Sequence, residues 1–402
     1  MRIFRPFIVL LLVLPLSLAA VKKNMQAFSE GNGPAVVLDE FFAGQVERYG
    51  LAAIGACIVR DGKVVWSDGF GLADIEAKRP ATADTLFPVG SVSKTVTLAA
   101  FMRLLEQGKC ALDDDVSRYL PYPLRNPRIP DRPITLCHLL SFTSGIFDVD
   151  LQAGRNRLSF LEEERDPQTS AVAALKEFLV PGGRHYAAEN FLEYPPGERY
   201  AYSNSSYSLI GAVVERLSGR PFREYCHDEL FASLGMQAST WRLGDLDHRR
   251  YAFGYRREGG RLAKVQPTTW PGYMDGGLRT TPRDFGRFLA MMANRGEFQG
   301  KRVLKAKTID QMLAPQAAPG APAGKGLPVI SRGLVWILSQ AGERRVWQMN
   351  GFGPSFFAQV YFDPEKKTAG AFFTTGAFRS LDEMGRAVGE MLATLMEYED
   401  TV

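Results

Sequence analysis

The chain has 402 residues, of which 46% are hydrophobic, with 48 Lys and Arg residues against 44 Asp and Glu residues. A chain of this length and apolar content can bury a large core, as one two-lobed unit or as two domains. Its formal net charge of +4 is spread evenly along the sequence. This balance gives no electrostatic case for a nucleic-acid partner.

The N-terminus has the layout of a secretory signal peptide. Arg2 and Arg5 precede an apolar stretch at 7–18, which is followed by small residues. An uncleaved anchor would need about 20 apolar residues to span a membrane, and no cysteine before Cys57 could carry a lipid. The sequence predicts a signal peptide at 1–20 and a periplasmic or secreted protein, with no stable membrane span after cleavage.

Two strand patterns at 53–60 and 63–68 precede the most informative motif, Ser91-Val92-Ser93-Lys94, which opens an apolar-periodic run to Gln107. Residues three apart in a helix share one face, so Ser91 and Lys94 are expected to meet. A partly desolvated lysine can take the proton of a serine and make it a nucleophile. A helix with both residues on a solvated face is the alternative for an isolated Ser-x-x-Lys.

A second motif, Tyr202-Ser203-Asn204, lies between a loop rich in Pro, Gly and Glu and an apolar helical stretch at 207–217. Taken alone, Asn204 or Ser205 would be a helix N-cap and Tyr202 a packed aromatic. In an extended segment, Tyr202 and Asn204 would instead point to one side. A phenol beside an amine can move protons, and an amide can orient the lysine or the substrate.

The rest of the chain predicts the architecture. Further strand patterns occur at 333–338, 345–349, 356–362 and 370–375, and Ser380 to Glu383 form a capping box that opens a final helix to about residue 398. We expect an α/β (α+β) fold in which an antiparallel sheet is flanked by helices. The sheet lobe would comprise about 36–108 and 325–402, with a mostly helical lobe at about 109–312 between them. Ser91 would lie at the seam of the two lobes.

Cysteine and histidine usage argues against metal, redox and Ser-His-Asp chemistry. The four cysteines are too far apart for a Cys-x-x-Cys site, the four histidines have no metal-ligand spacing, and Gly-x-Ser-x-Gly is absent. These spacings predict no metal site, and a serine activated by a lysine needs neither a metal nor a cofactor. Four cysteines in an exported chain allow three disulfide pairings.

With both motifs in place, the chain resembles the serine β-lactamase and penicillin-binding-protein superfamily, over residues 36–402. The branch with Ser-x-x-Lys and Tyr-x-Asn includes class C β-lactamases, D-Ala-D-Ala carboxypeptidases, D-amino-acid amidases and lactamase-fold esterases; class A enzymes have Ser-Asp-Asn at the second motif. Three further segments match: the Asp61-Gly62 hairpin, Thr143-Ser144-Gly145 after a helix, and Asp275-Gly276-Gly277-Leu278. The resemblance implies a β-lactamase/transpeptidase-like fold.

The third family motif, Lys-Thr-Gly or His-x-Gly, is replaced by Met349-Asn350-Gly351. Methionine cannot bind a substrate carboxylate as a cation does. Asn350 takes the first motif position if the alignment slips by one residue. Lys367-Thr368-Ala369 is a less favoured match, because it follows Pro364-Glu365 at a hairpin tip.

The resemblance assigns roles to the remaining residues. Ser91 would attack a carbonyl, Lys94 would accept its proton, and Tyr202 would relay protons to the leaving group. Asn204, Asn350, Gly351 and Phe352 would bind or orient a small-molecule or peptide acyl substrate, and the backbone N–H groups of Ser91 and Phe352 would bind the oxyanion. Cys110 and Cys137, near each other in the resembled fold, are the expected disulfide.

Three functions follow from this resemblance. The first is an exported serine hydrolase that acts through an acyl-enzyme on esters or amides. The second is a peptidoglycan D-Ala-D-Ala carboxypeptidase, β-lactamase or transacylase with the same chemistry. The third is a non-catalytic, penicillin-binding-like protein, which Met349 favours and the intact Ser91, Lys94 and Tyr202 oppose.

Overall fold

The computed structural model describes residues 33–150, 155–156, 163–316, 327–399 and 401. The predicted signal peptide at 1–20 lies outside the described residues. No helix within these ranges is long and apolar enough to cross a membrane.

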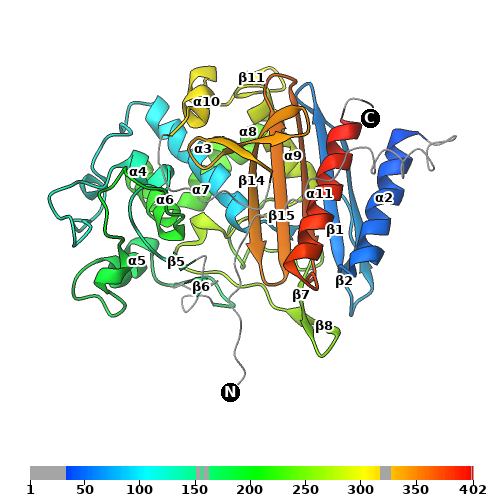
Figure 1. Cartoon of the computed structure of the whole chain (residues 1–402), viewed down its shortest axis with the longest axis horizontal. Helices are drawn as coiled ribbons and strands as arrows, with labels where there is room; N and C mark the ends of the chain where they lie inside the picture. The colour runs from blue at the N-terminus through cyan, green and yellow to red at the C-terminus, as the bar shows by residue number, and fades with distance from the viewer. Residues whose placement is uncertain (1–32, 151–154, 157–162, 317–326, 400, 402) are drawn as a thin grey trace.

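An eight-stranded antiparallel sheet forms one side of the molecule, with the strand order β12-β13-β14-β15-β16-β1-β2-β3 (Figure 1). Its strands are β1 (Ala53–Arg60), β2 (Lys63–Asp74), β3 (Arg79–Pro80), β12 (Val329–Arg332), β13 (Ile337–Ala341), β14 (Arg344–Gly353), β15 (Phe356–Asp363) and β16 (Thr368–Thr375). Strands from the two ends of the chain meet where β16 pairs with β1. The predicted antiparallel sheet flanked by helices is confirmed.

The helices lie on both faces of the sheet and in the section between its two groups of strands. They are α2 (Pro34–Tyr49), α3 (Ser93–Glu106), α4 (Leu136–Leu140), α5 (Ala171–Leu179), α6 (Asn204–Ser218), α7 (Phe222–Cys226), α8 (Ala232–Leu234), α9 (Pro282–Ala293), α10 (Ala306–Leu313) and α11 (Leu381–Tyr398). Short helical turns are η1 (Gly90–Val92), η2 (Val116–Arg118), η4 (Ala188–Asn190), η5 (His227–Phe231) and η6 (Tyr273–Asp275). Four two-stranded pairs complete the fold: β4 (Phe87–Pro88) with β9 (Arg279–Thr280), β5 (Val149–Asp150) with β6 (Arg155–Asn156), β7 (Gly254–Glu258) with β8 (Arg261–Val265), and β10 (Glu297–Phe298) with β11 (Lys301–Arg302).

Two hydrophobic clusters hold these layers together. On one face of the sheet, α2 and α11 pack side by side (Figure 1) and bury Phe42 and Met391 in one cluster with Tyr361 of β15. The other face packs against α9, and its cluster continues into α3 and α6. Because β14 contacts η1 directly, the turn that carries Ser91 is fixed between the sheet and the helical section.

The strand predicted at 333–338 is wrong in position. The structure has β12 before it, residues 333–336 form a turn, and β13 begins at Ile337, so only residues 337–338 of the predicted strand lie in a strand. Val335 has a φ of 60°, and Trp336 is fully buried. An apolar run of this length fits a buried turn as well as a strand, so its composition alone cannot separate the two.

The predicted disulfide between Cys110 and Cys137 is wrong, because both cysteines are free thiols. Their segments do lie together, since the Cys137 N–H donates to the Leu112 carbonyl at 2.8 Å. This backbone hydrogen bond places Leu112, not Cys110, opposite Cys137. The Cys137 thiol instead contacts Oε1 of Gln316 at 3.6 Å.

The final helix begins where the capping box predicts, although the box is completed differently. The Ser380 hydroxyl accepts from the Glu383 N–H at 3.1 Å. The Glu383 carboxylate accepts from the Arg379 N–H at 2.6 Å, one residue before the expected partner.

A buried ionic network fixes the other end of α11 to the sheet. Glu399 is fully buried and accepts from Arg344, from the Thr368 hydroxyl at 3.0 Å and from the Tyr361 hydroxyl at 3.2 Å. Glu399→Gln is expected to lower the free energy of unfolding by about 3 kcal/mol, because it leaves the Arg344 charge with poorer compensation. Urea unfolding of this variant and of Glu397→Gln, a more exposed position on the same helix, measures the difference. Equal unfolding midpoints for the two variants would contradict this account.

Candidate active site

Ser91 and Lys94 are positioned by the junction of η1 with α3. Gly90, with a φ of 50°, turns the chain into η1, and Ser91 lies one turn before Lys94. The Lys94 Nζ atom lies 3.1 Å from Ser91 Oγ. Ser91 is partly exposed and Lys94 is fully buried, so the hydroxyl can meet a substrate while the amine stays shielded from water.

Tyr202 meets the same hydroxyl from the other side, 2.5 Å from Ser91 Oγ. Its ring packs on Phe142 at a centroid distance of 4.7 Å, and Lys94 Nζ lies 5.1 Å from the ring centroid. Burial holds the pKa of Tyr202 well above its ordinary value of 10, and Asp275 and Asp148 add to this effect against the Ser91 hydrogen bond. Tyr202 is therefore a protonated phenol at neutral pH and can donate.

Asn204 is the first residue of α6, and its Oδ1 accepts from Lys94 Nζ at 2.8 Å. The N-cap of this helix is Ser203, not the Asn204 or Ser205 expected from the motif alone: the Ser203 hydroxyl accepts from the Ser206 N–H. The Asn204 side chain thereby stays available to Lys94.

Two further contacts define the state of Lys94. Its Nζ donates to the Asp275 carbonyl at 2.6 Å. Burial lowers the pKa of Lys94 to about 8, while the negative charges of Asp275 and Asp148 oppose this shift. In the neutral amine, two N–H bonds serve Asn204 Oδ1 and the Asp275 carbonyl, and the lone pair then faces the Ser91 hydroxyl. This arrangement suits a general base.

The motifs did not predict Asp148, Asp275 or Phe142 as parts of the site. Asp275 opens the Asp-Gly-Gly segment, and its buried carboxylate accepts from the Ser208 hydroxyl at 2.7 Å. Asp148 comes three residues after Gly145, and Phe142 has a φ of 58°. Asp275 meets Lys94 through its backbone carbonyl, Asp148 accepts from backbone N–H groups of α6, and Phe142 packs on Tyr202. A search for paired side chains does not detect contacts of these kinds.

The third motif segment approaches Ser91 through its backbone. A Cβ at Gly351 would lie 1.9 Å from the Val89 carbonyl and 3.0 Å from Ser91 N, so only glycine fits there. A Cβ at Gly90 would lie 3.4 Å from Phe352 N. The segment that carries the Phe352 nitrogen therefore lies directly against the turn that carries the Ser91 nitrogen.

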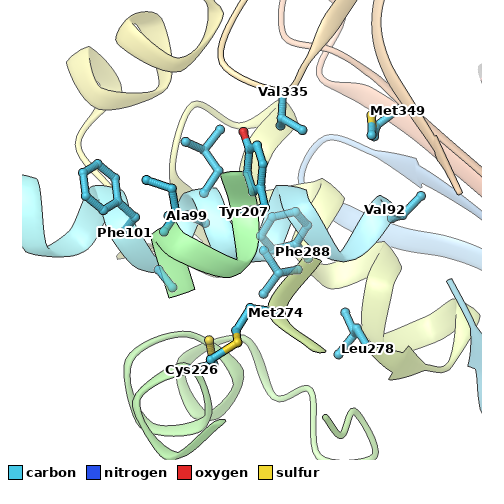
Figure 2. Packing of buried hydrophobic residues seen from close by; sticks show 14 of the residues in the cluster. Val92, Ala99, Phe101, Tyr207, Cys226, Met274, Leu278, Phe288, Val335 and Met349 are labelled. Carbon is cyan, nitrogen blue, oxygen red and sulfur yellow. The ribbon is translucent and has the colours of Figure 1, made fainter. Parts of the chain in front are cut away.

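The side chains of this segment have different surroundings. Met349 is only 5% exposed and belongs to the same buried cluster as Val92 and Val335 (Figure 2). Asn350 is half-buried, and Phe352 is 38% exposed. Met349 therefore provides neither a cation nor an exposed apolar surface.

Two other features of the sequence are structural. Lys367 is exposed, with a φ of 56°, in the turn between β15 and β16, and Thr368 is bound to Glu399. His138 completes the capping box of α4 with Thr135.

The site has the Ser-x-x-Lys and Tyr-x-Asn geometry in a sheet-and-helix frame, and the family model described as Beta-lactamase matches residues 38–393. The chain belongs to the beta-lactamase family. Esterase EstB of Burkholderia gladioli is 31% identical over 224 residues, which cover 55% of each chain. The chain spans only about half of the length of the curated relatives that it matches, from 43% to 55%.

Solved structures agree with this assignment. The octameric penicillin-binding protein homologue from Pyrococcus abyssi has a TM-score of 0.71 and 25% identity, and the match covers 90% of this chain and 77% of that one. EstCE1, described as a hydrolase with promiscuous acyltransferase activity, has a TM-score of 0.72 and 20% identity over 90% of this chain and 98% of that one. At 20% identity, the likeness to EstCE1 shows only that the two chains share a fold.

Proposed function

We propose that the protein is an active-site serine hydrolase that forms an acyl-enzyme with ester or amide substrates. The observation that carries this proposal is the placement of the Ser91 hydroxyl within hydrogen-bond distance of both Lys94 Nζ and Tyr202 Oη. A weak nucleophile is activated by a neighbouring base of this kind. We also propose, on the predicted signal peptide at 1–20, that the enzyme acts in the periplasm or outside the cell.

In the first step, Ser91 Oγ bonds to the carbonyl carbon while neutral Lys94 takes the hydroxyl proton. The negative oxygen of the tetrahedral intermediate would be bound by the backbone N–H groups of Ser91 and Phe352. Tyr202 donates a proton to the leaving group as the bond to it breaks, and Lys94 returns a proton to Tyr202. A water molecule then attacks the acyl group with the same residues in reversed roles, which releases the acid and restores Ser91.

The substrate class follows from the surroundings of the third motif. Met349 cannot attract a carboxylate, and a substrate that relies on a charge-assisted hydrogen bond there loses roughly 1.5–3 kcal/mol. The backbone nitrogen of Phe352 lies near the turn that carries Ser91, and its side chain is 38% exposed. We propose that this ring offers an apolar contact for an acyl or alkyl group. The likeness to an esterase over half of the chain supports the same conclusion. We therefore propose neutral esters as the preferred substrates over penicillins, cephalosporins and D-Ala-D-Ala peptides.

We expect kcat/KM for p-nitrophenyl butyrate to exceed that for a chromogenic cephalosporin and for a D-Ala-D-Ala peptide. The lost carboxylate contact corresponds to a penalty of about 10- to 150-fold. The measurement is initial-rate hydrolysis of all three substrates by one preparation, with Ser91→Ala as the background control. Faster turnover of the cephalosporin would contradict the ester preference and would require another cation in the site.

A further inference from the structure

Asp148 is a fully buried carboxylate beside the active site, contributed by the loop that follows Thr143-Ser144-Gly145. It accepts three hydrogen bonds: from the Ser203 hydroxyl at 3.2 Å, from the Asn204 N–H at 3.0 Å and from the Ser205 N–H at 2.5 Å. A buried carboxylate is stable only with such partners. All three donors belong to or adjoin the Tyr202-Ser203-Asn204 motif.

These contacts fix the first turn of α6. The N–H groups at a helix N-terminus lack partners inside the helix. Asp148 accepts from the first two of them, while Ser203 serves the N–H of Ser206. The turn carries the Asn204 side chain that accepts from Lys94, and Tyr202 lies two residues before it. A shift of this turn would move both Asn204 and the Tyr202 hydroxyl relative to Ser91.

We propose that Asp148 is a positioning residue for the reaction at Ser91, which holds Tyr202 and Asn204 in place through its hydrogen bonds to the first turn of α6. This inference rests on the proposed function. Asp148 lies 57 positions from Ser91 in the sequence. In this proposal it fixes the geometry of the second motif, and its charge contributes to the electrostatic environment of Lys94.

The charge of Asp148 also acts on Lys94. The charges that influence Lys94 are Asp275 from η6 and Asp148 from the loop after Gly145, and its uncharged neighbours are the side chains of Ser91, Tyr202 and Asn204. Burial lowers the pKa of Lys94, and the two carboxylates raise it. Removing the charge of Asp148 therefore lowers the pKa of Lys94 further. Since the neutral amine is the active base, the rise of activity with pH should move to lower pH.

The test is the rate at which a fluorophosphonate labels Ser91, followed by intact mass between about pH 6 and pH 9.5. In Asp148→Asn, we expect the maximal labelling rate to fall by up to about 100-fold, since misplacement of reacting groups by 1 Å has an effect of this size. We also expect the acid limb of the pH profile to move to lower pH. A loss of stability alone would not move this limb.

Asp284→Asn is the matched control. Asp284 is also a buried carboxylate that accepts a backbone N–H, from Ala238 at 2.9 Å, and a serine hydroxyl, from Ser239 at 3.1 Å. It is not among the charges that act on Lys94. The acid limb of the pH profile of Asp284→Asn should coincide with that of the wild type. An unchanged limb and rate in Asp148→Asn would overturn the inference.

A second variant keeps the test decisive if Asp148→Asn does not fold. Ser203→Ala removes one donor to Asp148 and the N-cap but retains the carboxylate. We expect slower labelling, by about 10-fold, whereas labelling at the wild-type rate would overturn the positioning role. Wild-type protein that is not labelled at Ser91 would contradict the proposed function itself. A labelled wild type with no change in either variant would contradict only this inference.

Discussion

Ser91→Ala is expected to abolish ester hydrolysis, with a loss of roughly 10⁶-fold in kcat, the size seen when a serine nucleophile is removed. The variant lacks the oxygen that would bond to the carbonyl carbon, and neither Lys94 nor Tyr202 can replace it. Ser91 is partly exposed, so the fold should be retained. Initial-rate hydrolysis of p-nitrophenyl butyrate, together with a thermal unfolding curve, measures both effects.

The neighbouring serine is the control for this substitution. Ser93 is fully buried, and its hydroxyl accepts from the Leu278 N–H at 3.0 Å. Ser93→Ala should lower the melting temperature and still hydrolyse the ester. Activity that survives in Ser91→Ala and disappears in Ser93→Ala would move the nucleophile to Ser93.

The second large effect concerns the two proton-transfer groups. Lys94→Ala and Tyr202→Phe should each lower kcat by about 10²- to 10⁴-fold, the usual range for acid and base groups. In the proposed mechanism, neutral Lys94 is the active form, and its pKa of about 8 predicts that kcat/KM of the wild type rises as the pH increases through about 8. This rise should be absent in Lys94→Ala. Steady-state rates of the three proteins across this pH range provide the measurement.

Tyr200→Phe is the matched control for Tyr202→Phe. Both rings pack on Phe142, at centroid distances of 5.7 Å and 4.7 Å, but only the Tyr202 hydroxyl meets Ser91. Loss of the Tyr200 hydroxyl should leave kcat within about threefold of the wild type. Equal losses in the two variants would show that aromatic packing, not proton transfer, explains the result.

The sequence predicted the parts of the site that depend on local geometry. Ser91 and Lys94 are one helical turn apart, so helix periodicity alone places them together. Strands β1, β2, β14, β15 and β16 followed from apolar patterns and from the Asp61-Gly62 turn, where both residues have positive φ. The patterns did not predict β3 or β12, and they misplaced the strand expected at 333–338. These features need no knowledge of which distant segments become neighbours.

The parts that could not be predicted depend on contacts between distant segments. Asp148 reaches α6 across 55 residues, and the Asp275 carbonyl reaches Lys94 across 181 residues. The burial of Met349 in one cluster with Val335 depends on how the turn between β12 and β13 packs. The expected disulfide between Cys110 and Cys137 is absent for a related reason, because proximity of two segments does not determine which side chains face each other.

The most direct test of the acyl-enzyme is the intact mass of the wild-type protein quenched in acid during turnover of p-nitrophenyl butyrate, followed by peptide mapping. The account predicts a mass increase of one butyryl group on the peptide that contains Ser91, which decays as the substrate is exhausted. Tyr202→Phe should accumulate less of this species per unit time, and Ser91→Ala none. Hydrolysis at the full rate with no covalent adduct, or an adduct on a residue other than Ser91, would contradict it.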